Sequence, residues 1–248
     1  MPIKHTEAKM NKTVFITGGS KGIGAEAVRQ FSRLGYKVAF TYLNSFKNAE
    51  KIAQETGAMP ILCDVSSSSS VNNAILEAKN ALGDIDILIN NAGIDEFSLF
   101  TDITDEMWEK MISTNLSSAF YASRAVLPSM ISKKDGVIIN ISSMWGEVGA
   151  SCEVHYSVSK AGLIGLTKAL AKEVGPSGIR VNCITPGVID TDMNKNLSKE
   201  DLEQLKTDTP LGKIGKPEDV VNTILFLCSE ASTFITGQVF GVNGGYII

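Results

Sequence analysis

The feature that most constrains the fold is a regular alternation of short apolar runs with longer segments of helical periodicity. Runs such as Val14-Phe15-Ile16 and Val137-Ile138-Ile139 are continuously apolar, which is typical of parallel strands buried on both faces of a sheet. Seven such runs are predicted as strands: 13–17, 37–42, 59–64, 85–90, 136–141, 179–185 and 238–242.

Helical periodicity of 3.6 residues fills the segments between these strands. The predicted helices are 23–34, 71–82, 107–130, 158–174 and 218–228. Repeated βα units with short connections predict an α/β fold, a single doubly wound Rossmann-type domain with a mainly parallel seven-stranded sheet flanked by helices on both faces.

No linker divides the chain, so residues 1–248 form one predicted domain. Residues 1–12 form a polar N-terminal extension, and the serine run 66–70 is predicted to be a solvated loop that leads into the helix beginning near Val71. The polar helical stretch 194–209, within about residues 190–212, is predicted to be a mobile substrate lid.

Composition excludes several classes of function. The net charge of −4 gives no surplus of cations for nucleic acid. The N-terminus has no apolar signal segment, and no run approaches a membrane span, so we expect a cytoplasmic protein without a membrane partner. We expect the cysteines to be scattered reduced thiols, with no metal site: Cys63, Cys152, Cys183 and Cys228.

A glycine-rich turn follows the first predicted strand, in the segment from Thr17 to Gly24 with glycines at 18, 19, 22 and 24. Glycine permits backbone conformations closed to other residues, and it lets a pyrophosphate approach the free N–H groups of the next helix. The spacing G-x-x-x-G-x-G differs from the G-x-G-x-x-G fingerprint. A strand–helix turn without a ligand is the alternative, but we predict nucleotide binding.

The end of the second strand indicates which dinucleotide binds. NAD enzymes place an acidic residue about 20 residues beyond the glycines to bind the ribose 2′-hydroxyl. No acidic residue occurs here between Glu26 and Glu50. We therefore predict NADP(H) in preference to NAD(H), with four side chains as candidates to bind the 2′-phosphate: Lys21, Thr41, Asn44 and Ser45.

Tyr156 and Lys160 are the first candidates for catalysis. Positions i and i+4 share a helix face, so Lys160 can lie beside Tyr156. A nearby ammonium is expected to lower the pKa of the phenol toward neutrality, as a proton donor to a reduced carbonyl requires. The pair alone is a weak signal, because a surface Tyr–Lys pair has the same spacing.

Two further polar residues strengthen the catalytic prediction. Ser143 follows the fifth strand, at the edge where open α/β sheets bind ligands, and its hydroxyl can donate to a substrate carbonyl; turn chemistry is the alternative role. Asn115 lies inside a predicted helix, where Asn has poor propensity. It either points to solvent or marks a functional distortion of that helix.

The motifs in their order resemble the short-chain dehydrogenase/reductase family over essentially the whole chain. They are Thr17-Gly18-x-x-x-Gly22-x-Gly24, Asp64-Val65, Asn90-Asn91-Ala92-Gly93, Asn115, Ser143, Tyr156-x-x-x-Lys160 and Pro186-Gly187. The resemblance implies that Tyr156 is the acid/base, that Ser143 orients the carbonyl, that Lys160 holds the ribose and tunes Tyr156, and that Asn115 supports a water relay to Lys160.

The resemblance also implies the remaining cofactor contacts. Asp64 and Val65 would flank the adenine, Asn91 to Gly93 would line the cofactor, and Ile189 and Thr191 would contact the carboxamide. With the residues above, the predicted cofactor site is Gly18, Ser20, Lys21, Gly22, Ile23, Gly24, Thr41, Tyr42, Asn44, Ser45, Asp64, Val65, Asn91, Ala92, Gly93, Tyr156, Lys160, Pro186, Gly187, Ile189 and Thr191.

Within the family, the chain looks most similar to bacterial 3-oxoacyl-[acyl-carrier-protein] reductases of fatty acid biosynthesis. This resemblance implies a ketone carried on an acidic carrier protein, docked by a basic patch beside the active site. Lys133 and Lys134 are candidates for that patch, although a second docking arginine of such reductases falls on Ser177 here.

The segment 143–153 instead resembles a subgroup that reduces a ketone-bearing lysine modification on elongation factor P. Five side chains, besides Ser143 and Tyr156, would then border the substrate: Trp145, Glu147, Cys152, Glu153 and His155. A role that only shapes the loop is the open alternative for these five. Glu147 and Glu153 suit a polar or cationic substrate better than an acyl chain.

A non-catalytic dinucleotide-binding regulatory protein is the third hypothesis, since a fold does not imply a function. The intact Tyr, Lys, Ser and Asn set disfavours it. The apolar C-terminal run 237–248 is expected to pack against something, and the family resemblance implies a homotetramer.

Overall fold

The computed structural model describes residues 12–192 and 198–248, and within them a seven-stranded sheet in the order β3-β2-β1-β4-β5-β6-β7. Every neighbouring pair of strands runs parallel. The strands are β1 (Thr13–Ile16), β2 (Lys37–Tyr42), β3 (Met59–Leu62), β4 (Ile85–Asn90), β5 (Gly136–Ile141), β6 (Ile179–Pro186) and β7 (Val239–Val242). This arrangement confirms the predicted doubly wound α/β fold.

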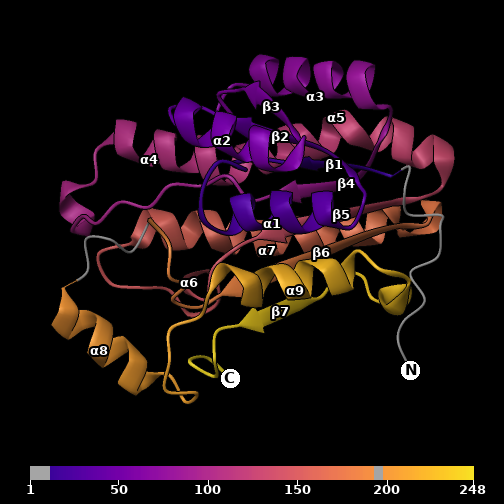
Figure 1. The fold of residues 1–248 in the computed structure, drawn as a ribbon. Coiled ribbons are helices and arrows are strands. Elements are labelled where there is room, and N and C mark those ends of the chain that lie inside the picture. The colour runs from indigo at the N-terminus through magenta and orange to yellow at the C-terminus, as the bar shows by residue number, and fades with distance from the viewer. Residues whose placement is uncertain (1–11, 193–197) are drawn as a thin grey trace.

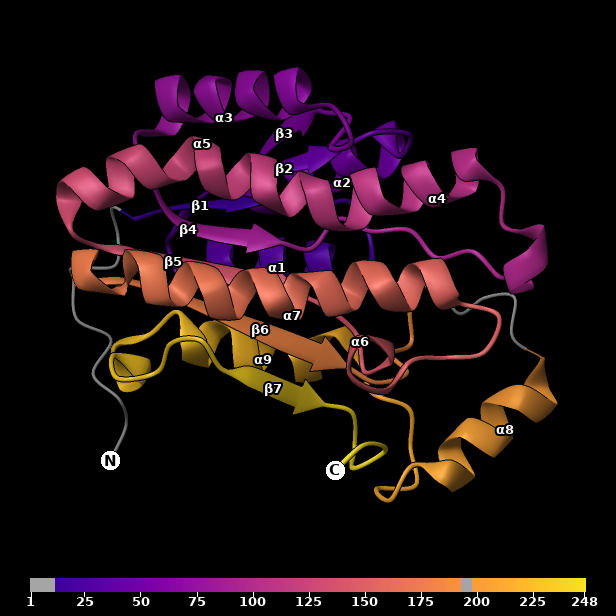
Figure 2. The same cartoon turned by 180° about the vertical axis from the view of Figure 1, so that it is seen from behind.

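The helices connect the parallel strands, and they cover both faces of the sheet. They are α1 (Gly22–Arg33), α2 (Phe46–Thr56), α3 (Ser68–Leu82), α4 (Asp105–Ile112), α5 (Ser118–Lys133), α6 (Trp145–Val148), α7 (Val154–Val174), α8 (Lys199–Asp208) and α9 (Pro217–Leu227). Helices α1 and α9 lie in front of the sheet in Figure 1, and α5 and α7 lie in front of it in the reverse view of Figure 2.

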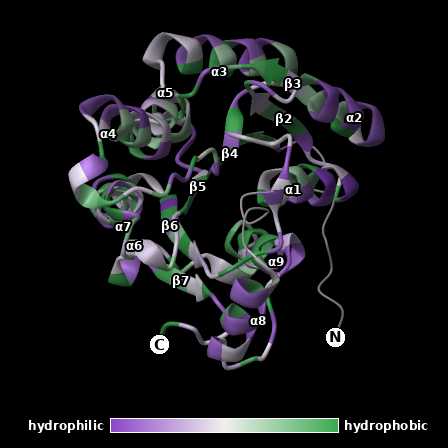
Figure 3. Cartoon of the chain, turned by 90° about the vertical axis from the view of Figure 1, so that its left-hand side faces the viewer, coloured by the Kyte–Doolittle hydropathy of each residue, from purple (hydrophilic) through white to green (hydrophobic). Residues whose placement is uncertain are grey.

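Two apolar cores fill the space between the sheet and its two helix layers. One joins the strands to α1, α2 and α9, and the other joins them to α3, α5 and α7. All six residues of β5 are buried, which explains why the strands read as continuous apolar runs. Figure 3 shows the strands mostly in green, whereas the helices carry both green and purple faces.

Helix α2 was not among the predicted helices. Only Ala49 and Ile52 of this helix are buried, but their spacing of three residues is helical, so the sequence did contain a signal for α2. The serine run is a loop only at Ser66 and Ser67: Ser67 caps α3 by accepting a hydrogen bond from Ser70 N, and the helix begins at Ser68, three residues before the predicted start.

The predicted lid contains a helix, α8, whose capping box joins Ser198 and Asp201. Figures 1 and 2 both show α8 outside the two helix layers. Residues 193–197 of the predicted lid and residues 1–11 of the predicted extension lie outside the described part of the chain. Within that part, no helix combines the length and the apolar character needed to cross a membrane.

Candidate active site

The glycine turn is packed against the carboxyl end of β4. Gly18 and Gly22 have left-handed φ values of 69° and 52°, which favour glycine. A Cβ atom on Gly24 would lie 2.2 Å from the Gly18 carbonyl oxygen and 2.6 Å from Asn91 Nδ2. Glycine is therefore required at these positions by the turn itself, in addition to any ligand.

Hydrogen bonds from β2 and β4 hold the turn in place. Thr17 Oγ1 accepts from the backbone N–H groups of Asn91 and Ala92, each at 3.0 Å. Asn91 Nδ2 donates to the carbonyl oxygens of Thr17 and Gly18, at 3.0 and 3.1 Å. Thr41 Oγ1 accepts from Gly18 N at 3.0 Å. Asn91 thus supports the turn with its side chain.

The N-terminus of α1 fits the pyrophosphate of a dinucleotide. Lys21 occupies the N-cap position without a capping hydrogen bond from its side chain, and the first turn contains no acidic residue. The first N–H groups of the helix therefore lack a side-chain partner, and the helix dipole favours an anion there. Ser20 and Ile23, which border this N-terminus, are both partly exposed.

The predicted 2′-phosphate residues separate into two groups. Thr41 is buried, and its Oγ1 accepts from the glycine turn, so it supports the turn from below. Asn44 is exposed and Ser45 partly exposed just beyond β2, and Ser45 makes no capping hydrogen bond at the start of α2. Lys21 is also exposed, with its Nζ 3.6 Å from Asp192 Oδ2.

The remaining predicted cofactor residues also lie at the carboxyl edge. Asp64 is exposed beyond β3 and accepts from Ser66, whereas Val65 is buried in the core. Beyond β6, Ile189 is buried and forms a bridge with Gly215, and Thr191 lies next to Gly22. The cofactor segments are therefore brought together from β1, β2, β3, β4 and β6.

Ser143 and Tyr156 lie side by side, and each residue is 7% exposed. Burial raises the pKa of the Tyr156 phenol above its ordinary value. The nearby Ser143 hydroxyl opposes this rise, while Asp95 and Glu153 add to it. The expectation of a phenol pKa lowered to neutrality by Lys160 is therefore wrong for the chain itself, and Tyr156 holds its proton at pH 7.

Lys160 lies beneath Tyr156 with its Nζ 5.6 Å from the centre of the phenol ring, as the i to i+4 spacing predicted. The Nζ donates to the Ile141 carbonyl oxygen at 3.0 Å. Burial lowers the pKa of Lys160 to about 8, because a charged amine loses its hydration inside the protein. An ionised Lys160 therefore lies beside the phenol near neutral pH.

Asn115 occupies a distortion of the predicted 107–130 helix, which the structure divides into α4, a π-helical turn over Ser113–Ser117, and α5. Asn115 is 1% exposed. Its Oδ1 accepts from Ile94 N at 2.8 Å, and its Nδ2 donates to Ile94 O at 2.9 Å and to Ser159 Oγ at 3.1 Å. The distortion of the helix was therefore the correct alternative, and the solvent-facing side chain was wrong.

Gly93 shows how close Asn115 and Lys160 lie to each other. A Cβ atom on Gly93 would lie 3.3 Å from both Asn115 Oδ1 and Lys160 Nζ. The two polar groups therefore border the same point of the β4–α4 segment. Their proximity supports the water relay that the family resemblance implies.

The predicted substrate residues lie in and around α6. Trp145 packs edge-on against Tyr246, with ring centres 5.8 Å apart. Glu147 is exposed, Cys152 is partly exposed with a φ of 62°, and Glu153 is buried. Glu153 therefore differs from the other polar residues of this segment, because it faces the interior beside Tyr156.

Sequence reasoning missed residues that only support the site. Ser142 Oγ donates to the Lys160 carbonyl oxygen at 2.7 Å and so fixes α7 to β5. Asn90 Nδ2 donates to Asn140 Oδ1, and Asn140 Nδ2 donates to Thr167 Oγ1, both at 2.8 Å. The sequence did contain a signal for these supporting contacts: a polar residue such as Asn140 inside a buried strand needs a hydrogen-bond partner.

The predicted carrier-docking pair lies at the other end of the sheet. Lys133 ends α5 just before the start of β5, and its Nζ lies 2.6 Å from Asp86 Oδ1 at the start of β4. Parallel strands place these starts at the edge opposite Ser143 and Tyr156. Lys133 and Lys134 therefore do not border the catalytic group of the same chain, which corrects the expectation of a basic patch beside it.

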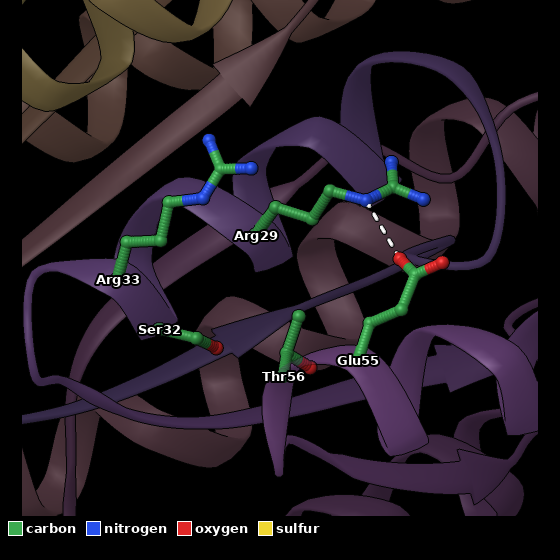
Figure 4. Close-up of a pocket in the computed structure, with 5 residues that line it drawn as sticks. All are labelled: Arg29, Ser32, Arg33, Glu55 and Thr56. Carbon is green, nitrogen blue, oxygen red and sulfur yellow. Dashed lines mark hydrogen bonds and ion pairs between the residues drawn. The ribbon is translucent and has the colours of Figure 1, made fainter.

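A cavity of about 380 Å³ also lies away from the catalytic edge, where α1 and α2 end (Figure 4). Arg29, Arg33 and Glu55 line it, and Arg29 Nε donates to Glu55 Oε2 at 3.0 Å. All four cysteines are free, and the described residues contain no group of three or more His, Cys, Asp or Glu arranged to hold a metal ion.

The glycine turn and the Ser–Tyr–Lys group at one sheet edge define a dinucleotide-dependent oxidoreductase. A family model described as Enoyl-(Acyl carrier protein) reductase matches residues 18–247. The chain is 40% identical to 3-oxoacyl-[acyl-carrier-protein] reductase FabG of Chlamydia trachomatis, across 95% of this chain and 97% of the relative. It is 41% identical to FabG of Aquifex aeolicus, across 94% and 96%.

The solved structures lead to the same family. A short-chain dehydrogenase/reductase of Serratia marcescens, solved as a double mutant, superposes with a TM-score of 0.89 and 33% identity, covering 95% of this chain and 97% of that one. The chain belongs to the short-chain dehydrogenase/reductase family.

Proposed function

We propose that this protein is an NADP-dependent reductase of ketones. The observation that carries the proposal is the buried Ser143–Tyr156 pair with Lys160 beneath it, at the edge that also holds the glycine turn. The family implies a nicotinamide cofactor, whose chemistry when bound is to supply a hydride.

The roles of the four residues follow from their positions. Ser143 donates a hydrogen bond to the carbonyl oxygen and stabilises the charge that develops on it. Tyr156 transfers its phenolic proton to that oxygen, assisted by the ionised Lys160 beside it. Asn115 holds the β4–α4 segment through Ile94 and keeps the neighbourhood of Lys160 open to a relay of protons.

A 3-oxoacyl thioester presented by an acyl carrier protein is the first candidate substrate, supported by the 40% identity to FabG. We expect NADPH-dependent reduction of an acetoacetyl thioester, measured by loss of NADPH absorbance. No turnover of that thioester would reject this candidate, while leaving the reductase proposal to be tested on other ketones. The chain is also proposed to work in the cytoplasm.

A ketone-bearing lysine modification on elongation factor P is the second candidate. Two observations favour it: the buried acidic Glu153 borders Tyr156, and Lys133 and Lys134 lie at the opposite end of the sheet. Turnover of a protein-bound ketone, but not of an acetoacetyl thioester, would select this candidate. A non-catalytic dinucleotide-binding regulator remains the third and is rejected by either activity.

The oligomer we propose is a homotetramer. Strand β7 ends the sheet, so its outer edge has no partner strand within the described part of the chain. Phe234 and Ile248 are fully exposed near this edge and the C-terminus. Apolar side chains and an open strand edge of this kind are usually covered by a further copy of the chain.

The preference for NADP is tested at Lys21. We expect Lys21→Ala to raise the KM for NADPH about 10- to 100-fold, the usual effect of removing a charged hydrogen bond, and to change the KM for NADH far less. Steady-state kinetics with both cofactors measure this difference. Lys51→Ala is the control, since Lys51 is an exposed lysine in the middle of α2. Equal increases for both cofactors would reject a phosphate contact at Lys21.

A further inference from the structure

Glu153 is a buried carboxylate beside the catalytic group that the proposed mechanism does not use. The residue is 6% exposed, and its Oε2 is fully buried without a hydrogen-bond partner. Leaving a carboxylate oxygen buried and unpaired is costly for a folded protein. Such an atom at a ligand-binding edge therefore indicates a partner supplied by a ligand.

The fold brings a second carboxyl group, Asp95, to the same place. Asn115 clamps the backbone of Ile94 through hydrogen bonds of 2.8 and 2.9 Å, and Asp95 is the next residue. Ser98 N donates to Cys152 O at 2.9 Å, and Glu153 follows Cys152. The segments 94–98 and 152–153 therefore lie side by side. The first carries Asp95 and Glu96, and the second carries Glu153.

The electrostatics of these groups show that they interact. Burial raises the pKa of Glu153 to about 7, and the proximity of Asp95 adds to the rise. The pKa of Asp95 is also raised, because neighbouring protein atoms displace part of its water, although His155 and Lys160 attract its charge. Both carboxyl groups in turn act on the pKa of Tyr156.

His155 is a second polar side chain that is buried in this region without a hydrogen-bond partner. Its side chain is completely buried, and neither ring nitrogen has a hydrogen-bond partner among the described residues. The titratable groups that act on the two carboxyls are thus His155 and Tyr156 of α7 and Lys160 one turn further. Lys160 donates to the Ile141 carbonyl oxygen, and it leaves Glu153 Oε2 without a hydrogen-bond partner.

We propose that Asp95 and Glu153 form a subsite that binds a cationic group, such as an ammonium, carried by the ketone substrate. Asp95 is exposed and can meet an incoming ligand, while Glu153 supplies the unpaired buried oxygen. A cation between them separates two like charges and satisfies that oxygen. The inference rests on the proposed reductase function and names its substrate class.

A pair of ketones that differ only in charge tests the proposal. The probes are para-(aminomethyl)acetophenone and para-ethylacetophenone, in which an ammonium replaces a methyl group. We expect kcat/KM with NADPH to be about 10- to 100-fold higher for the amine, the usual effect of a charged hydrogen bond. Because both probes use the same proton donor, their ratio isolates the cation subsite from the catalytic step.

Variants identify the residues responsible for that ratio. Glu153→Gln keeps the size of the side chain and removes its charge, so the ratio should fall to within about threefold of one, and Asp95→Asn should lower it independently. Glu109→Gln is the matched control, because Glu109 is an exposed carboxylate of α4. A ratio that both Glu153→Gln and Asp95→Asn leave at the wild-type value would overturn the assignment.

The pH dependence of the ratio provides a readout that a merely structural role would not change. Glu153 is protonated below its raised pKa of about 7 and charged above it. The ratio should therefore rise as the pH increases from about 6 to about 8 in the wild type, and it should stay flat in Glu153→Gln. Reduction of both probes at equal rates rejects the subsite alone, whereas failure to reduce any ketone rejects the reductase function.

Discussion

Replacing Tyr156 by Phe is expected to lower kcat about 100- to 10,000-fold, the contribution that a positioned general acid typically makes. The substitution removes one oxygen atom and leaves the ring that packs above Lys160. Ser143 would keep its capacity to donate to the substrate oxygen, so the loss isolates proton transfer from carbonyl orientation. NADPH affinity should stay within a few fold of the wild type, because the glycine turn and α1 are unchanged.

The measurement is single-turnover reduction of a ketone, with NADPH binding followed by fluorescence titration. Tyr36→Phe is the matched control: Tyr36 is also buried, and it packs edge-on against Phe31 in the core. The control should keep kcat. Full activity of Tyr156→Phe would disprove the assigned proton donor, and an equal loss in both variants would point to general damage to the fold.

The sheet could be predicted from the sequence because burial on both faces leaves a direct trace in composition. Runs such as Val137-Ile138-Ile139 are typical of strands in a sheet covered by helices on both faces, and this run lies in β5 at such a position. The bounds of β2, β4 and β5 were predicted to the residue. Helix α2 was missed although Ala49 and Ile52, which face the core, have helical spacing.

The sequence could bring the candidate catalytic residues together as a set, but it could not predict their electrostatics. The spacing of Tyr156 and Lys160 places both on one helix face. Spacing carries no information on burial, which raises the pKa of Tyr156 and lowers that of Lys160. For the same reason the sequence alone did not reveal Asp95, whose neighbours come from the distant α7.

The position of Lys133 and Lys134 depends on strand direction. The resemblance to carrier-protein reductases implied a basic patch beside the site, and these two lysines were the candidates for it. Strand β5 lies between them and Ser143, so the two lysines precede the strand and Ser143 follows it. The two lysines and Ser143 therefore lie at opposite ends of β5, and so at opposite edges of the sheet.

Gly24→Ala is expected to have the second large effect, because the new methyl group meets backbone rather than a flexible side chain. The Cβ would lie 2.2 Å from the Gly18 carbonyl oxygen and 3.0 Å from its carbon. This clash is relieved only if α1 moves away from the turn. Such a movement disturbs the packing of Ala25 and Val28 in the core. We expect the free energy of unfolding to fall by about 2–3 kcal/mol.

The same displacement should weaken cofactor binding. A shift of α1 moves the N–H groups at its N-terminus away from the bound pyrophosphate, and a displacement of about 1 Å can lower kcat/KM about 100-fold. Urea denaturation measures the stability, and NADPH titration together with steady-state kinetics measures the binding and the activity.

Gly165→Ala in α7 is the matched control for this substitution. No atom lies within 4 Å of a Cβ built on Gly165, and its backbone is helical. Alanine there should raise the free energy of unfolding by about 0.5–1 kcal/mol, because it restricts the unfolded chain and favours the helix. Opposite signs for the two glycines would show that the contact between α1 and the turn, and not the loss of a glycine, limits stability and cofactor binding. Wild-type stability and NADPH affinity in Gly24→Ala would show that the turn tolerates this methyl group.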